Sequence, residues 1–239
     1  MKIWENLVED TEKIVPSDVQ CEIKMINSTE SLTRFANSHI HQNVEEEITD
    51  VYLTFHSGGK TTNLNLNITS LRSIDEVVKK ALSELANNPK DSNWPGLASK
   101  EKSFDGYKSI SPENPDLRAQ KVKDFIDQGK SFNGAGYCSS NVSNVFVWNT
   151  DGLNSSDTAT SAFLDGIFRS ETSSGSSHIG HKILENIDGK KVGQEAYSIA
   201  KESQNPQDID PGIYEVILGP DAVSTILDFL AVYGFNAKS

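Results

Sequence analysis

Alternating apolar and polar positions predict a β-hairpin early in the chain. Apolar residues alternate with polar ones over residues 51–56 and again over 64–68, and a glycine turn at 58–59 separates the two stretches. Alternation on both sides of a short turn is typical of two antiparallel strands that bury one face. We therefore expect a hairpin here.

The preceding stretch, residues 32–44, has a more ambiguous pattern. Its apolar residues recur every four positions, which leaves a helix open as an interpretation. Thr33 and Phe35 favour a strand, and the segment 37–39 consists of poor helix formers. The balance favours strands over residues 19–44.

Helical periodicity, together with start and stop signals, predicts five helices. Ser73 and Glu76 form a capping-box pattern, and Asn114 followed by Pro115 is a typical helix start. The predicted helices cover residues 3–14, 73–87, 115–129, 192–203 and a last segment from 220 onward.

Four other segments complete the predicted order of elements. Residues 88–112 have little periodicity and are expected to form a long surface connection, and 142–168 are expected to form a second hairpin region. The Ser/Gly-rich residues 173–177 predict a flexible tract, and 213–218 predict a buried strand before the last helix. On that helix four apolar residues are expected to face inward: Val223, Ile226, Leu227 and Leu230.

These elements predict an α+β fold. An N-terminal antiparallel sheet packs with helices, and further hairpins and helices of a second β-rich region follow it. The expected division places an N-terminal domain at residues 1–130, including the connection at about 88–112, and a middle region at 131–239.

Composition narrows the classes of function. The chain has 34 acidic and 22 basic residues, a net charge of -12 and a pI near 4.8, so its field repels nucleic acid and anionic lipid. We expect neither as a partner. The N-terminus lacks a secretory apolar core and no long apolar run occurs, which predicts a cytoplasmic protein. Cys21 and Cys138, the two cysteines, are expected to be reduced thiols.

Candidate catalytic chemistry is sparse. No serine lies in a nucleophile elbow, and no base accompanies Cys138, so no catalytic residue is assigned. His181 and Glu185 at helical spacing, with His178 as a third ligand, form an alternative zinc site without a placed general base. The alternative is that all three side chains are solvated surface residues that bind no metal.

Four stretches resemble the TldD/PmbA family, whose members were proposed as modulators of DNA gyrase and are regarded as metallopeptidases. They are residues 33–42, the Asn-rich hairpin leading into the helix at Ser73, residues 136–140 with the turn at 149–152, and residues 214–223. The resemblance covers nearly the whole chain and favours β-structure for residues 32–44. It implies that the chain is about the N-terminal half of a longer protein that continues into a β-rich domain.

The resemblance also implies that the metal site is degenerate. Catalytic members carry a His-Glu-x-x-x-His motif on the helix after the strand that corresponds to 213–218, and that motif holds zinc and activates water. Aligning the helix places Asp228 at the first histidine, Phe229 at the glutamate and Tyr233 at the second histidine. Neither a metal ligand set nor a catalytic residue is therefore expected in this chain.

This departure resembles the PmbA, or TldE, branch. It implies a non-catalytic subunit that pairs with a TldD-like catalytic subunit or with itself as a dimer, and that helps to form a chamber for peptides or unfolded polypeptides. No cofactor is expected in this chain, and zinc is expected in the catalytic partner. Two alternatives stay open: an active metallopeptidase with a rebuilt metal site, and a standalone peptide-binding or scaffold protein.

Overall fold

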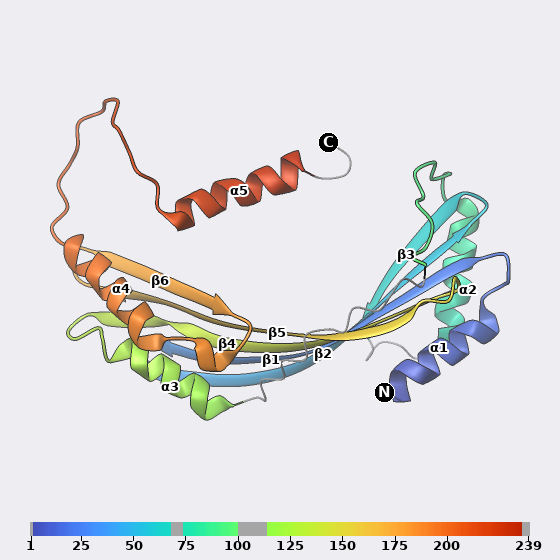
Figure 1. Ribbon diagram of the computed structural model, residues 1–239, viewed down its shortest axis with the longest axis horizontal. Helices are drawn as coiled ribbons and strands as arrows, with labels where there is room; N and C mark the ends of the chain where they lie inside the picture. The colour runs from blue at the N-terminus through green and yellow to red at the C-terminus, as the bar shows by residue number, and fades with distance from the viewer. Residues whose placement is uncertain (1, 68–73, 100–113, 236–239) are drawn as a thin grey trace. The chain divides into compact units, whose positions relative to one another are not determined.

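The computed structural model describes residues 2–67, 74–99 and 114–235 (Figure 1). It divides into two compact units, Met1–Asn205 and Pro206–Ser239, which are treated separately below. Ser73 of the predicted capping box lies outside the described residues, as do residues 100–112 of the predicted 88–112 connection. Among the described helices none is long and apolar enough to cross a membrane.

The first unit combines helices with two groups of consecutive strands. Its helices are α1 (Lys2–Ile14), α2 (Ile74–Asn87), α3 (Pro115–Ile126), the short 3-10 helix η2 (Leu184–Asn186) and α4 (Gly189–Glu202). Its strands are β1 (Gln20–Ala36), β2 (His39–Ser57), β3 (Lys60–Asn67), β4 (Asn133–Asn149), β5 (Asn154–Arg169) and β6 (Ser174–His181). The second unit contains α5 (Pro220–Gly234).

All six strands form one antiparallel sheet in the order β3-β2-β1-β4-β5-β6. The predicted α+β class with an antiparallel sheet is confirmed. The second hairpin, β4–β5, joins the same sheet through pairing of β4 with β1, so the sheet continues across residue 130. The two compact units meet in the sequence between residues 205 and 206.

The β1–β2 hairpin confirms the prediction of strands over residues 32–44. The turn residues Asn37 and Ser38 have φ of 50° and 61°, which is the conformation of a type I′ turn. The Ser38 amide donates to the Gly134 carbonyl at 2.9 Å, and the Gly134 amide donates to Ser38 Oγ at 2.9 Å. The turn is therefore fixed to the start of β4.

One face of the sheet is covered by helices at both of its ends. On β1 the odd positions are buried near each end, so both helix layers lie on the same face, because strand side chains alternate between faces. Helices α1 and α2 pack at one end of the strands, and α3 and α4 pack at the other (Figure 1). Two separate hydrophobic cores result.

Each core has a distinct set of buried side chains. The core beneath α1 and α2 includes Trp4, Leu7, Ile23, Leu53, Phe55, Val78 and Trp148. The core beneath α3 and α4 includes Phe35, Val122, Phe125, Leu164, Phe168, Val192 and Ala196. In the second core the Phe125 and Phe168 rings stack with their centroids 4.6 Å apart.

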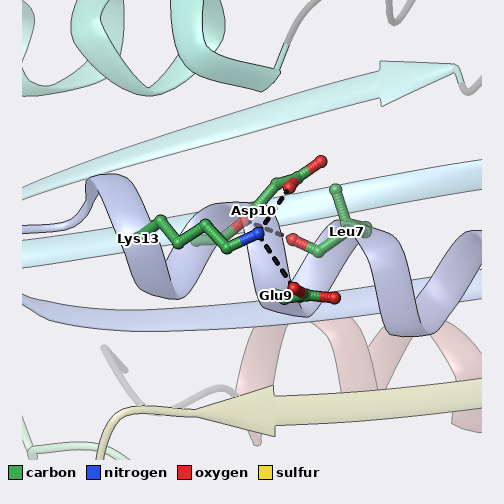
Figure 2. Close-up of polar contacts among 5 residues, drawn as sticks. Leu7, Glu9, Asp10 and Lys13 are labelled. Atoms are coloured by element: carbon green, nitrogen blue, oxygen red, sulfur yellow. Dashed lines mark hydrogen bonds and ion pairs between the residues drawn. The ribbon is translucent and has the colours of Figure 1, made fainter.

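The helix boundaries follow identifiable local signals. Asn114 caps α3 as predicted, because its side-chain oxygen accepts a hydrogen bond from the Leu117 amide at 2.9 Å. In α1 the Lys13 ammonium lies 2.9 Å from a Glu9 oxygen and 3.5 Å from an Asp10 oxygen (Figure 2). The Thr11 hydroxyl donates to the Leu7 carbonyl at 2.7 Å within the same helix.

The prediction of a flexible tract at residues 173–177 is wrong. Residues from Ser174 onward form β6, which pairs with β5 along its whole length. Gly175 allows the α4 backbone to approach closely, and Ser177 Oγ donates to Glu195 of α4 at 2.9 Å. The small residues Gly175 and Ser177 therefore let α4 pack closely against the edge strand β6.

Two predictions for the second unit are also wrong. Residues 213–218 form no strand, and Ile213 and Ile217 are fully exposed. The predicted helix exists as α5, but none of its residues is buried, including Val223, Ile226, Leu227 and Leu230. The physical reason is that the described residues of this unit supply no strand to pair with 213–218.

Candidate functional site

The residues aligned with the family's metal motif lie on α5. Phe229 and Tyr233 are one helical turn apart, and their rings stack with centroids 6.1 Å apart and an interplanar angle of 9°. Phe229 has no polar atom on its side chain, and the Tyr233 phenol is not among the nitrogen, sulfur and carboxylate ligands that usually bind zinc. Asp228 supplies a single carboxylate. These three side chains do not fit a zinc ion.

The alternative metal ligands are not brought onto one helix face. The spacing of His181 and Glu185 would place them on one helix face, but β6 ends at His181 and Glu185 lies in the 3-10 helix η2. His178 pairs with Asp165 and His181 with Ala162, so the two histidines occupy opposite faces of β6. His181 Nδ1 instead accepts a hydrogen bond from the Ile183 amide at 3.0 Å.

No cluster of three histidine, cysteine or acidic side chains that could hold a metal occurs in the described ranges 2–67, 74–99 and 114–235. A zinc site normally needs three or four such ligands converging within about 2.3 Å of the ion. The described residues therefore offer no assembled metal centre.

The two cysteines are free thiols buried in separate cores. Burial raises the pKa of Cys21 to about 12. Burial likewise raises the pKa of Cys138 to about 12, and the nearby Arg118 and Lys121 charges only partly oppose this. Because the thiolate is the reactive form, neither cysteine is a nucleophile at neutral pH.

A buried arginine is the feature that sequence analysis missed. Arg118 of α3 is 1% exposed, and its guanidinium donates to Ser140 Oγ at 3.2 Å and to Asn43 Oδ1 at 3.4 Å. Thr33 Oγ1 also donates to Asn43 Oδ1, at 3.1 Å. The network ties α3 to β1, β2 and β4. No signal in the sequence indicated that Arg118 is buried beside Leu117, because arginine is ordinarily exposed on a helix.

Residues 38–40, which belong to the stretch 33–42 that carried part of the family resemblance, line one side of a hollow of about 430 Å³. The hollow lies between the β1–β2 turn and α3, and His39, Gln120 and Lys123 are among its lining residues. His39 Nδ1 lies 2.7 Å from the Asn37 carbonyl. The hollow thus presents one imidazole held by the turn backbone, without a second histidine or a cysteine in its lining.

A comparison with solved structures identifies the fold. TldE from Thermococcus kodakarensis aligns with a TM-score of 0.68 at 16% identity over 83% of this chain and 47% of that one. The chain shares the fold of TldE. A candidate modulator of a DNA gyrase from Thermotoga maritima aligns with a TM-score of 0.63 at 19% identity over 88% of this chain and 50% of that one. A third, a candidate modulator of DNA gyrase from Bacteroides thetaiotaomicron, gives 0.70 at 12% identity over 87% and 51%.

The resemblance inferred from the sequence is therefore confirmed at the level of the fold. The chain spans about half the length of the solved TldE and gyrase-modulator chains. No protein-family model and no curated protein sequence matches it.

Proposed function

We propose that this chain is a PmbA/TldE-like, non-catalytic subunit of a TldD/PmbA-type metallopeptidase complex. Two independent lines support the proposal. The fold is that of TldE and of two gyrase-modulator proteins, and the sequence resemblance to the TldD/PmbA family runs through the same chain. In this role the chain binds no zinc and helps to enclose a peptide that a zinc-bearing partner hydrolyses.

The observation that carries the proposal is the chemistry of α5. The resemblance to catalytic members places their glutamate base at Phe229 and their second histidine at Tyr233. Here the two aromatic rings stack on one another, and neither carries the carboxylate that serves as general base in catalytic members. A polypeptide with this helix needs another chain to supply the metal and the general base.

A β-rich subunit suits the handling of extended peptides. The strands β3 and β6 form the two edges of the sheet, and extended peptides commonly bind by adding a strand to such an edge. A substrate held in this way is bound mainly through its backbone. The chamber would then accept unfolded or flexible polypeptides of varied sequence.

Co-purification from the native cell tests the proposal. The tagged full-length protein should retain a second polypeptide that carries a His-Glu-x-x-x-His motif, and peptidase activity should follow that polypeptide. A matched control is the same purification after the partner's motif glutamate has been changed to glutamine, which should keep the complex and abolish hydrolysis. Recovery of peptidase activity from this chain without any partner would contradict the proposal.

A further inference from the structure

A groove runs between one flank of α1 and the end of the β4–β5 hairpin. Two hollows of about 400 and 430 Å³ make up this α1 groove, and Glu12 lines both of them. Trp4 and Phe146 line the first hollow, and their ring centroids lie 5.5 Å apart. Trp4 is buried in the core beneath α1 and Phe146 packs against that core, so the two rings give the groove a fixed apolar floor.

The walls of the α1 groove carry carboxylates. Glu5, Glu9 and Glu12 line the first hollow, and their spacing of four and three residues places them on one face of α1. Asp18 and Asp151 continue the acidic lining in the second hollow, and all five residues are exposed. No described lysine, arginine or histidine lines either hollow.

Most of these carboxylates have no cationic partner in the described part of the chain. No ion pair among those residues involves Glu5, Glu12 or Asp18. Glu9 lies 2.9 Å from the Lys13 ammonium, but an exposed pair of this kind is weak and exchanges partners readily. The groove therefore combines an apolar floor with a surplus of negative charge, which is complementary to cationic side chains that have an apolar stem.

Strand β5 has an open edge beside the α1 groove. Its first residue, Asn154, lines the first hollow, whereas β6 pairs only with residues 162–169 of β5. The chain after β6 reaches no further than Thr160, whose hydroxyl donates to the Lys182 carbonyl at 2.8 Å. No described strand pairs with the outer edge of residues 154–159, so the backbone there is open to another extended chain.

Helix α1 runs alongside the strands at this place (Figure 2). Trp4 near its start contacts Phe146, and Val15 just past its end lines the second hollow together with Thr150. Two of the acids on α1 are four residues apart, which separates them by about 6 Å along the helix axis. Alternate side chains of an extended chain lie about 6.6 Å apart. The acidic flank of α1 thus matches the repeat of an extended peptide.

We propose that the α1 groove binds an extended polypeptide segment with lysine or arginine at alternate positions. The backbone of the segment adds to the open edge of β5. The basic side chains point to the face that carries α1 and meet Glu5, Glu9 and Glu12 above the aromatic floor. The intervening side chains point to the opposite face, on which β5 carries another acid, Asp157.

A basic peptide fits these features better than a phosphate-bearing ligand does, because an acidic groove repels phosphate. Lysine and arginine place their aliphatic stems on aromatic rings and extend their charged ends to carboxylates. The inference goes beyond the proposed function, since a basic segment binds here without zinc and without a catalytic partner.

Binding of a peptide with basic residues at alternate positions tests the inference. A fluorescein-labelled peptide of five Lys-Thr repeats should bind the purified full-length protein in fluorescence anisotropy at about 0.15 M salt, where long-range charge effects are screened. Glu5→Gln/Glu12→Gln should raise its Kd about fivefold, because two exposed ion contacts are lost. Glu45→Gln/Glu46→Gln is the matched control, since it removes the same charge from exposed residues of β2 outside the groove, and it should change the Kd less than about twofold.

Hydrogen exchange measured by mass spectrometry locates the bound peptide. The peptide should slow amide exchange in residues 154–159 and leave β3, an edge strand without the acidic groove, unchanged. Spermidine should compete weakly, because it has no backbone amides to pair with β5, and circular dichroism should show the same fold in all variants. Failure of the Lys-Thr peptide to bind, equal losses in the two double variants, competition by spermidine as strong as by unlabelled peptide, or slowed exchange at β3 rather than at 154–159 would each overturn the inference.

Discussion

Replacing Gly175 by alanine tests the docking of α4 on β6. A Cβ atom at this position would lie 2.2 Å from the Ala200 nitrogen and 2.4 Å from the Ala196 oxygen. Both are backbone atoms of a helix, so no side-chain rotation can make room. The strand and the helix must separate by about 1 Å, which disrupts packing that is close to crystal density.

Overpacking a core in this way costs about 1–3 kcal/mol, and the rigidity of both elements places Gly175→Ala at the upper end, near 3 kcal/mol. Urea unfolding followed by far-UV circular dichroism measures the change in free energy of unfolding. Ser176→Ala is the control, because Ser176 is exposed and lies on the other face of β6, and it should change stability by no more than about 0.5 kcal/mol. Equal stability of Gly175→Ala and wild type would refute the close packing of α4 on β6 and would favour the interpretation of 173–177 as a flexible tract.

Three further predictions concern the sheet and its cores. Arg118→Ala removes the guanidinium that donates to Ser140 and Asn43, so urea unfolding should show a loss of about 2–3 kcal/mol, and a smaller loss in Arg118→Lys. Ser38→Ala should cost about 1 kcal/mol because it removes the acceptor of the Gly134 amide, whereas Asn37→Gly should be neutral or stabilising because the turn requires positive φ. Because burial raises the thiol pKa of both cysteines from 9.0 to about 12, only the unfolded thiols ionise between these values, and stability should fall as the pH rises through that window. In a Cys21→Ala/Cys138→Ala variant the free energy of unfolding, measured by chemical denaturation, should fall less steeply between pH 8 and pH 11. Identical slopes in the variant and the wild type would contradict the raised pKa of the two thiols.

Local signals in the sequence were sufficient for elements whose apolar side chains pack within the first unit. The alternation at 51–56 predicted the hairpin, and Asn114 with Pro115 predicted the start of α3, because each signal acts through neighbouring residues. The strand β6 was missed because Ser and Gly have low intrinsic strand propensity. Its formation depends on pairing with β5 and on contact with α4, which are distant in sequence.

The candidate site shows the same limit. The spacing of His181 and Glu185 left open a shared helix face, but the chain between them leaves the sheet and forms η2, which spacing alone does not reveal. The apolar sequence of 213–218 predicted a buried strand, yet burial requires a pairing strand that the described residues of the second unit do not contain. Arg118 gave no sequence signal, because a buried charge is stabilised only by partners from other elements.

The metal content of the purified chain tests the central claim most directly. Elemental analysis of the full-length protein, separated from any partner and dialysed against a trace of zinc, should find far less than one zinc per chain. The account predicts that zinc appears in stoichiometric amount only when a partner with the intact motif is present. One tightly held zinc per isolated chain, lost on substituting His181 or Asp228 by alanine, would contradict it.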